Sequence, residues 1–507
     1  MEFRVKKVDL EIGENSIIMN REDAVERGLN AGDRVRLFLG PRARTVIVHL
    51  SSTFVSRGEI GIFASSMEEM GLKPGDTVRI AHAERPASID VIKKKMRGEK
   101  LGREEIFELV RDIVDDNLTD VELTAYVVSV QTMGMDMDEI AWLTEAMVKT
   151  GDTLDFEGEI FDVHSIGGVP GNKYALIAVP TAAAAGLRIP KTSSRAISSA
   201  AGTADVMEVL ARVDLSLEKI KEIVETVGAT LAWGGAVNLA PADDKIIRVE
   251  YPLGIDPRPQ LLASVMAKKK AMGANVVVID IPMGEEAKVE NYAEARKLAR
   301  DFIELGERLG MMVDVAITYG GQPVGRAIGP ALEAKEALMA LEGKPVSSSL
   351  IEKSTAIAGI LLELGGKARR GEGKAVAKEI LRSGRSREKF LEIIEAQGSR
   401  GIESSEEVPV GKYHEDVTSM EDGYVGRLSN KALVRIARIA GSPRDKGAGI
   451  WLNKKKGDRV EKGDVLFTIY SSSKERLEMA LRAARRLMPH KIEGMILERI
   501  PSYHEEG

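Results

Sequence analysis

The stretch IFDVHSIGGVPGNK, residues 160–173, decides how the largest part of this chain should fold. Three of its first four residues are apolar, which is typical of a short buried strand. A loop of small residues follows, and the apolar pattern of residues 174–187 predicts a helix directly after it. A strand, a tight loop and a helix in this order are typical of a parallel α/β sheet.

The same alternation continues along the chain. Further strand-like runs occupy residues 230–232, 276–281 and 313–317, and a clear helical pattern at 293–309 separates the last two. This order predicts a parallel sheet with right-handed crossovers. Ligands of such sheets bind beyond the carboxyl ends of the strands. We therefore expect a ligand-binding site at this edge of the sheet, in an α/β domain that spans residues 155–405.

The N-terminal part contains an internal repeat. GLNAGDRVRL at residues 28–37 recurs as GLKPGDTVRI at residues 71–80, an offset of 71 − 28 = 43 residues. Each copy contains a helix end, a Gly-Asp turn and an alternating strand. Two copies are too few for a solenoid. They predict a small pseudo-twofold β-barrel over residues 1–84, with a role in assembly and without catalytic residues.

The regions on either side of the α/β part have different patterns. Residues 87–150 are predicted to be helical, with a capping box from Thr119 to Glu122 and another helix start at Asp136. In residues 408–507, Gly-Asp hairpin patterns flank a helix at about 430–440, and another helix follows at 474–488. The overall prediction is a multidomain α/β protein with a small N-terminal β-barrel, a helical domain, a large parallel-sheet domain and a C-terminal α/β domain.

Composition excludes several classes of protein. Among 507 residues, 44% are apolar and 30% charged, which excludes a disordered chain. The net charge of 72 − 78 = −6 gives no support to a general nucleic-acid binder. The absence of cysteine excludes disulfides and thiolate metal sites, and the six histidines form no HxH or HxxxH pair, so we expect no metal and no cofactor. Without a signal peptide or a bilayer-spanning segment, we expect a cytoplasmic protein, and the Lys- and Glu-rich composition fits a thermophile.

Two loops have the residues of anion-binding sites. In the loop after residue 163, Gly168 and its neighbours allow backbone N–H groups to approach an anion, beside His164 and Ser165. The alternative is a tight strand–helix turn with a packed histidine. The second loop combines hydroxyls with one arginine, which can hold a phosphate through two hydrogen bonds; the alternative is a polar helix entrance. Its candidate residues are Ser193, Ser194, Arg195, Ala196, Ile197, Ser198, Ser199 and Thr203.

Three further residues could contribute to the chemistry. Asp256 precedes a predicted helix that contains Ser264, so the aspartate is either a helix cap or a general acid. Lys288 follows the strand at 276–281, on the ligand-binding side of the sheet, where a solvated surface lysine is the alternative. The two loops and these three residues together predict a site for a substrate with phosphate groups.

The motifs as a set resemble the thymidine and pyrimidine nucleoside phosphorylases, in the order of that family and from about residue 90 to 488. The N-terminal barrel and the serine-rich loop are more similar to the archaeal AMP phosphorylase branch. The motifs are IKKKMRG at 92–98, TLDF at 153–156, HSIGGV at 164–169, SSR at 193–195 with GTAD at 202–205, APAD at 240–243, QPVGRAIG at 322–329 with LE at 332–333, and DGYV at 422–425.

Some positions depart from the family pattern. Val163 stands where the family has a phosphate-binding lysine, and Ser194 and Ala196 stand where it has glycines. Ile166 replaces the threonine of a monovalent-cation site, so we expect no such ion. These changes fall where a pyrimidine nucleoside would bind, and they favour a nucleotide as substrate.

The resemblance implies an activity and a set of residues. The activity is phosphorolysis of nucleoside 5′-monophosphates, in which AMP and phosphate give adenine and ribose 1,5-bisphosphate, with CMP and UMP as further possible substrates, in nucleotide degradation. Asp256 is expected to be the proton donor to the base. Gly168, the loop from Ser194 to Ser199, Thr203, Ser264 and Lys288 are expected to bind the nucleotide, and His164, Ser165 and Ser193 to lie on the phosphate side.

The resemblance also implies an architecture. The helical domain, formed by residues 87–150 and completed by about 241–270, closes on the α/β domain. The C-terminal domain is hammerhead-like and helps dimerisation, so we expect a homo-oligomer built from dimers, with small-molecule partners and neither nucleic acid nor membrane.

Other functions remain open at this point. The nearest alternative is a thymidine or pyrimidine nucleoside phosphorylase. A phosphoribosyltransferase such as the anthranilate enzyme would need magnesium, and the sequence has no acidic metal cluster. The C-terminal hairpins resemble biotinyl or lipoyl carrier domains, but no Met-Lys-Met or Asp-Lys-Ala hairpin occurs among them.

Overall fold

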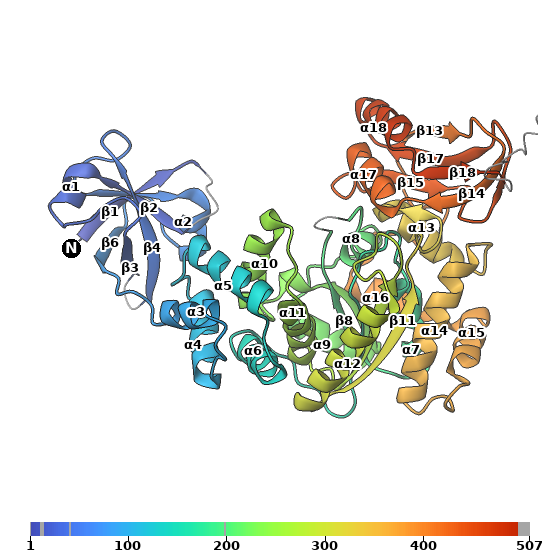
Figure 1. Ribbon diagram of the computed structural model, residues 1–507, viewed down its shortest axis with the longest axis horizontal. Helices are drawn as coiled ribbons and strands as arrows, with labels where there is room; N and C mark the ends of the chain where they lie inside the picture. Colours follow the sequence, from blue (N-terminus) through green and yellow to red (C-terminus); the bar gives the residue numbers. More distant parts are fainter. Residues whose placement is uncertain (1, 11–14, 40–41, 197–198, 495–507) are drawn as a thin grey trace, which may run out of the picture. The chain divides into compact units, whose positions relative to one another are not determined.

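The computed structural model describes residues 2–10, 15–39, 42–196 and 199–494. The chain forms two compact units (Figure 1). The first contains the chain up to Gly151 together with Ala240–Ala267, and the second contains Asp152–Leu239 and the chain from Lys268 onward. Within the described ranges, no helix is long and apolar enough to cross a membrane.

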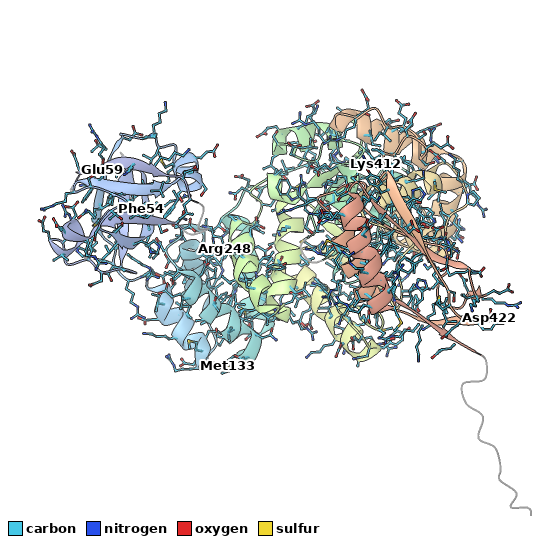
Figure 2. The ribbon with its side chains drawn as sticks, turned by 90° about the horizontal axis from the view of Figure 1, so that it is seen from above. Phe54, Glu59, Met133, Arg248, Lys412 and Asp422 are labelled. Atoms are coloured by element: carbon cyan, nitrogen blue, oxygen red, sulfur yellow. The ribbon has the colours of Figure 1, made fainter. Side chains whose placement is uncertain are left out.

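The first unit begins with a closed barrel of six strands in the order β1-β5-β2-β4-β3-β6, which confirms the predicted barrel. Its inward-facing residues are buried aliphatics, and Phe54 is a large apolar side chain on its outside, 59% exposed (Figure 2). The elements are β1 (Glu2–Val8), β2 (Ser16–Asn20), α1 (Arg21–Val25), β3 (Arg34–Leu39), β4 (Arg42–Ser51), β5 (Glu59–Phe63), α2 (Ala64–Met70) and β6 (Thr77–His82).

The two copies of the internal repeat adopt the same local geometry. Gly32 and Gly75 have φ angles of 91° and 92°, values that favour glycine. In the first copy Asp33 accepts a hydrogen bond from the Asn30 amide at 2.6 Å, and in the second Asp76 accepts one from the Lys73 amide at 2.8 Å. The strands that follow, β3 and β6, pair with each other in antiparallel fashion. The repeat therefore builds the two halves of one barrel.

Helices make up the rest of the first unit. The capping box of Thr119 and Glu122 and the helix start at Asp136 are present as predicted. The helices are α3 (Ser88–Met96), α4 (Arg103–Val114), α5 (Asp120–Met133), α6 (Met137–Lys149) and α10 (Pro241–Leu253), with the first part of α11 (Arg258–Ala271).

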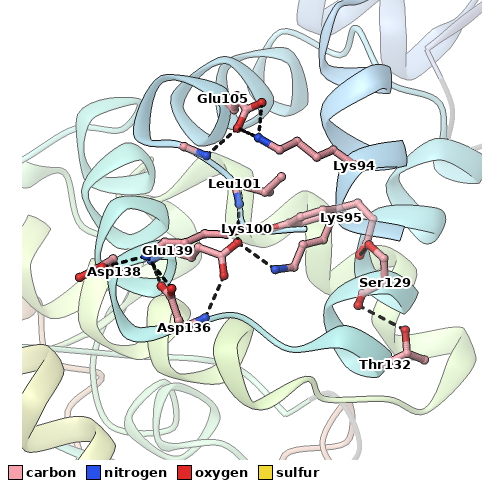
Figure 3. Close-up of polar contacts among 12 residues, drawn as sticks. Lys94, Lys95, Lys100, Leu101, Glu105, Ser129, Thr132, Asp136, Asp138 and Glu139 are labelled. Carbon is pink, nitrogen blue, oxygen red and sulfur yellow. Dashed lines mark hydrogen bonds and ion pairs between the residues drawn. The ribbon is translucent and has the colours of Figure 1, made fainter. Parts of the chain in front are cut away.

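A buried ion pair connects two of these helices (Figure 3). Lys95 of α3 and Glu139 of α6 lie 2.8 Å apart, and both side chains are almost fully buried. The Glu139 carboxylate also accepts hydrogen bonds from the Leu101 amide at 2.8 Å and the Asp136 amide at 2.9 Å. Burial of two charges is tolerated because the remaining lone pairs of the carboxylate are satisfied.

The second unit contains the parallel strands. They form a three-stranded sheet, in the order β11-β10-β7, and a two-stranded sheet of β8 and β9. The strands predicted at 160–163, 230–232, 276–281 and 313–317 correspond to four of these five strands. The five are β7 (Phe161–Ser165), β8 (Ile189–Ser193), β9 (Ala229–Trp233), β10 (Val276–Met283) and β11 (Met312–Tyr319).

The sequence interpretation was wrong about the segment before residue 194. Ser193 is a loop candidate of the sequence analysis, but it belongs to strand β8, together with Lys191 and Thr192. Lys191 and Thr192 are buried there, because β8 pairs with β9 along its whole length. The helix that follows, α8, is short and ends at Met207.

Helices pack around these strands over a large aliphatic core. The predicted helices at 174–187 and 293–309 correspond to the shorter α7 and to α12. The helices are α7 (Ala175–Ala183), α8 (Thr203–Met207), α9 (Leu217–Thr226), α12 (Tyr292–Arg308), α13 (Pro330–Leu341), α14 (Ser348–Leu364), α15 (Gly373–Arg382) and α16 (Arg385–Gln397), with a short 3-10 turn η1 (Gly234–Ala236).

The C-terminal part of the second unit contains antiparallel strands and two helices. Its hydrophobic cluster includes Ala200 and Ile328 of the preceding α/β part, so both parts contribute to this cluster. Strand β12 of the α/β part also pairs with β15. The elements are β12 (Ala327–Ile328), β13 (Tyr413–Thr418), β14 (Gly423–Leu428), α17 (Asn430–Ala440), β15 (Gly449–Leu452), β16 (Arg459–Val460), β17 (Val465–Ser471), α18 (Lys474–Leu487) and β18 (His490–Glu493).

Candidate active site

The second unit has a cavity of about 860 Å³, a volume in the range of small-molecule sites. Five segments line it: the loop after β7 with the start of α7, the segment from β8 to α8, the loop after β10, helix α13 through Glu333, and helix α17. The predicted site residues that line it are His164, Ser165, Gly168, Ser193, Ser194, Ser199, Thr203 and Lys288. The two predicted anion loops therefore face one cavity.

The glycine-rich loop after β7 needs glycine at two positions, Gly168 and Gly171, and at Gly171 a Cβ atom would lie 2.6 Å from the Ala327 carbonyl oxygen. Gly168 has a φ angle of 88°, and a Cβ atom there would lie only 2.6 Å from the backbone nitrogen of Lys288. Gly167, with a φ of 82°, has open space where its Cβ would be. Asn172 donates a hydrogen bond to the Ser165 hydroxyl at 2.9 Å across the loop. Gly168 therefore allows this loop and the Lys288 loop to touch.

A buried ion pair holds the far end of this loop. Lys173 and Glu336 lie 2.9 Å apart with no exposed side-chain surface. The Lys173 ammonium also donates to the carbonyls of Gly171 at 2.9 Å and Val324 at 3.0 Å. Glu336 accepts from the Arg326 and Ala327 amides, at 2.8 and 2.9 Å. This pair connects the glycine-rich loop to helix α13 through groups that are all hydrogen-bonded.

The serine-rich loop is organised by Asp205 of α8. Its carboxylate accepts hydrogen bonds from the Ala196 amide at 2.7 Å and the Gly202 amide at 3.0 Å. A Cβ atom on Gly202 would lie 2.4 Å from the carbonyl oxygen of Ser194, so the loop closes tightly on itself. The candidates Ile197 and Ser198 lie outside the described residues.

The structure gives the Arg195 side chain a different partner from the predicted phosphate. Its guanidinium forms two hydrogen bonds with Glu208, at 2.8 and 2.7 Å, and lies over the Trp233 ring at 4.5 Å. Neither Arg195 nor Ala196 lines the cavity. The sequence could not predict this pairing, because Glu208 reaches the arginine only through the turn between β8 and α8.

Two basic side chains with lowered pKa values, Lys191 and His164, line the cavity. Lys191 is only 5% exposed, and burial, together with the charge of nearby Lys269, lowers the pKa of Lys191 to about 7. Burial and the surrounding lysines, Lys269 first among them, lower the pKa of His164 well below its usual range. The imidazole is therefore neutral at neutral pH and offers one donor and one acceptor. The sequence analysis missed Lys191. The one feature of the sequence that could have indicated it is a cationic residue between the apolar and β-branched residues of β8.

A buried carboxyl also lines the cavity. Burial raises the pKa of Glu333 to about 7. The Glu333 side chain accepts a hydrogen bond from the Gly329 amide at 3.0 Å, at the start of α13. The sequence analysis noted Glu333 only as part of a family motif and assigned it no role.

The loop that carries Lys288 is attached to the C-terminal part of the unit. Glu286 accepts hydrogen bonds from the Ser429 hydroxyl at 3.0 Å and from the Lys431 amide at 2.8 Å, at the start of α17. Arg427 lies 3.2 Å from the same carboxylate. Farther along α17, Arg438 donates to the carbonyl of Ser199 at 2.9 Å. Helix α17 thus holds both the Lys288 loop and the serine-rich loop, which the sequence analysis did not anticipate.

Two predicted site residues belong to the other compact unit. Asp256 is exposed in the turn before α11, and Ser264 lies within α11. The Ser264 hydroxyl donates to the carboxylate of Asp243 at 2.7 Å, and Gln260 donates to the same carboxylate at 3.1 Å. The buried Asp243, in the APAD motif, therefore fixes the orientation of Ser264.

Comparison with known families agrees with this arrangement. Three family models match successive parts of the chain: the helical bundle domain of a glycosyl transferase family at residues 89–151, the α/β domain of a glycosyl transferase family at 157–387, and the pyrimidine nucleoside phosphorylase C-terminal domain at 424–491. Their order defines the class as glycosyl transferases of the nucleoside phosphorylase type.

Individual relatives make the assignment more specific. An AMP phosphorylase of Methanocaldococcus jannaschii is 55% identical over 504 residues, which cover 99% of both chains. An AMP phosphorylase of Thermococcus kodakarensis is 54% identical over 501 residues, also 99% of both chains. The chain belongs to the AMP phosphorylase family. A solved anthranilate phosphoribosyltransferase from Thermus thermophilus shares the fold, with a TM-score of 0.51 and 22% identity over 61% of this chain and 99% of its own.

Proposed function

We propose that this protein catalyses the phosphorolysis of AMP. Inorganic phosphate attacks C1′ of the ribose, the bond from C1′ to the base nitrogen breaks, and the products are adenine and ribose 1,5-bisphosphate. The observation that carries the proposal is one cavity lined by both anion loops and Lys288, in a chain 55% identical to an AMP phosphorylase over nearly its whole length. The reaction needs sites for two phosphate groups, that of AMP and the attacking inorganic phosphate. The two anion loops can supply these two sites.

The cavity fits the electrostatics of this reaction. Backbone amides of the glycine-rich loop, the hydroxyls of Ser165 and Ser193, and neutral His164 can donate hydrogen bonds to the attacking phosphate. Lys191 lies among them with a pKa lowered to about 7 by burial. A bound phosphate dianion favours the charged form of that ammonium, because an opposite charge nearby raises its pKa. These groups hold the nucleophile against C1′ without the need for a cofactor in the proposed reaction.

Asp256 is the proposed proton donor to the departing base. Negative charge develops on adenine as the bond to C1′ breaks, and a positioned acid typically contributes about 10²–10⁴-fold to the rate. The support is the resemblance of the surrounding motifs together with the exposed position of Asp256 beside α11. Ser264, oriented by Asp243, is the proposed nucleotide contact from the same helix.

We extend the proposal in four respects that rest on the same family resemblance. CMP and UMP are further substrates. The domains are residues 1–84, 87–150 with about 241–270, 155–405, and a hammerhead-like unit at 408–507. The protein is a homo-oligomer built from dimers, and it acts in the cytoplasm.

Deletion of residues 1–84 is expected to reduce the oligomer size measured by light scattering, and an unchanged size would contradict an assembly role for the barrel.

The decisive assay is release of free base, followed by chromatography. AMP, adenosine and thymidine are each incubated with the protein, with and without phosphate. We expect phosphate-dependent release of adenine from AMP at a rate far above that from either nucleoside. Equal turnover of thymidine and AMP would instead favour a pyrimidine nucleoside phosphorylase.

The role of Asp256 has its own test. Asp256→Asn keeps the shape of the side chain but cannot deliver a proton, so kcat on AMP should fall by about 10²–10⁴-fold. Asp90→Asn is the matched control, since Asp90 is an exposed residue of α3 that pairs with Lys93. Asparagine caps helices as well as aspartate does. Wild-type turnover by Asp256→Asn would therefore leave Asp256 as a capping residue.

A further inference from the structure

We propose that helix α17 binds the 5′-phosphate of the nucleotide through Lys431 and Arg435. The inference rests on the proposed function, because it names the part of the protein that distinguishes a nucleotide from a nucleoside at the same site. It assigns a direct binding role to α17 in the C-terminal part of the chain, and this helix begins 142 residues after the last predicted site residue, Lys288 (430 − 288 = 142).

The first observation is the placement of charge on α17. Lys431, Arg435 and Arg438 follow one another at spacings of four and three residues, which places them on one face of the helix. All three line the same cavity as Gly168, Ser194 and Lys288. The helix thus presents a row of cations to the loops that the sequence analysis assigned to the nucleotide.

The second observation is that two of these cations are available. Within the described part of the chain, the Lys431 ammonium and the Arg435 guanidinium have no carboxylate or carbonyl partner. The other cations of this region are engaged: Arg195 with Glu208, Lys173 with Glu336 and Arg438 with the Ser199 carbonyl. The carboxylate of Glu286, which also lines the cavity, accepts hydrogen bonds from the Ser429 hydroxyl and the Lys431 amide at the start of α17.

The third observation is that α17 is held in place beside the site. Glu286 caps its first turn, and Arg438 donates to Ser199 near its end. The neighbouring Ala200 of the serine-rich loop is buried in the hydrophobic cluster of the C-terminal part. Lys431 and Arg435 therefore project from an element whose position is fixed relative to the serine-rich loop, and binding of an anion requires little rearrangement of the backbone.

The position within the cavity indicates which phosphate is bound. Lys431 and Arg435 are exposed, at the mouth of the cavity, whereas Lys191 is buried at its inner wall. The attacking phosphate must lie beside C1′, and the proposed function assigns it to the buried inner-wall groups. The 5′-phosphate is at the other end of the ribose, and it can remain partly in contact with solvent. An arginine and a lysine at that point provide charge-assisted hydrogen bonds to it.

Calorimetric titration with AMP and with adenosine tests the proposal directly. We expect Arg435→Gln and Lys431→Gln each to weaken AMP binding by about 10-fold or more, as for loss of a charge-assisted hydrogen bond. Adenosine affinity should stay within about 2-fold of the wild type, because adenosine lacks the group that these side chains hold. Arg435→Lys should retain part of the AMP affinity. Glutamine is a good helix former and both positions are exposed, so the variants should fold.

Arg482→Gln is the matched control. Arg482 is an exposed arginine of α18, beside α17, and it does not line the cavity. This variant removes the same charge from the same part of the molecule and should bind AMP as the wild type does. If Arg482→Gln weakens AMP binding as much as Arg435→Gln does, AMP affinity depends on the overall charge of this region and not on a contact from Arg435, and the proposal is wrong.

Steady-state kinetics separate this proposal from the proposed function. In the variants, KM for AMP should rise while KM for inorganic phosphate stays unchanged. Unchanged AMP affinity in the Lys431→Gln/Arg435→Gln double variant overturns the inference, and so does a rise confined to KM for phosphate. If the wild type binds AMP but releases no adenine, the proposed reaction fails, while the calorimetric difference between AMP and adenosine still decides the role of α17.

Discussion

The glycine-rich loop after β7 and the serine-rich loop after β8 line the same cavity, but the protein holds them in different ways. The first is connected to α13 by the fully buried pair of Lys173 and Glu336. The second is held by the partly exposed pair of Arg195 and Glu208 and by hydrogen bonds from its amides to Asp205. The serine-rich loop also depends on α17, through Arg438.

This difference indicates that the two loops differ in how easily they change shape. Buried pairs are costly to break, so the glycine-rich loop should keep its shape whether or not a ligand is bound. Exposed pairs contribute little to stability and are screened by salt. The serine-rich loop should therefore adjust more easily to a ligand, with α17 limiting how far it moves. Four substitutions test this contrast.

The largest expected effect is on the buried pair. Lys173→Met keeps the length of the side chain but leaves Glu336 buried without its partner, which should lower the free energy of unfolding by about 3–5 kcal/mol. Urea-induced unfolding measures this loss. The double variant Lys173→Met/Glu336→Gln should recover part of it, since the uncompensated charge is gone. A loss below about 1 kcal/mol for Lys173→Met would show that the pair does not anchor the loop.

The next effect concerns Glu333, which lies at the cavity between the two loops. Burial raises the pKa of Glu333 from 4.5 to about 7. Between pH 4.5 and about pH 7, Glu333 is therefore protonated in the folded state but ionised in the unfolded state. Its contribution to stability is therefore complete below pH 4.5 and is lost as the pH rises to about 7, by at most about 3 kcal/mol. Glu333→Gln should remove this decline when unfolding is measured from pH 4.5 to 7.5. An identical pH dependence in both proteins would contradict the raised pKa.

The third effect is on activity. Gly168→Ala should lower kcat/KM for AMP by about 10²-fold, because the added methyl group displaces the Lys288 backbone by a fraction of an ångström or more. Gly167→Ala is the matched control: it has a similar positive φ but open space around the new methyl group. Gly167→Ala should therefore lower only the free energy of unfolding, by about 1 kcal/mol, because of backbone strain. Equal losses of activity in the two variants would mean that strain, not the contact with Lys288, is responsible.

The smallest expected effect is on the exposed pair. Arg195→Gln should lower the free energy of unfolding by less than about 1 kcal/mol. It should also change the fluorescence of Trp233, over whose ring the guanidinium lies, when Trp142 and Trp451 are replaced by phenylalanine. KM for phosphate should change by only a few-fold. A rise well above 10-fold would instead indicate that Arg195 leaves Glu208 and binds a phosphate directly.

The local features of the fold could be predicted because they depend on neighbours in the sequence. The Gly-Asp turns of the barrel, the capping box at Thr119 and the strand at 276–281 each follow from a few adjacent residues. Strand β8 was missed because Ile189–Ser193 is short and its burial results from pairing with β9, about 40 residues later. Its lysine and hydroxyl residues are typical of a loop when they are considered alone.

The sequence by itself determined the barrel, the parallel α/β arrangement and the two candidate anion loops. Only the tertiary structure decided which charged groups remain available at that cavity. It paired Arg195 with Glu208, buried Lys191 beside Lys269, and brought α17 against the serine-rich loop. The physical reason is that hydrogen bonds within turns and caps form between residues a few positions apart, whereas desolvation and ion pairing depend on whichever residues folding brings together.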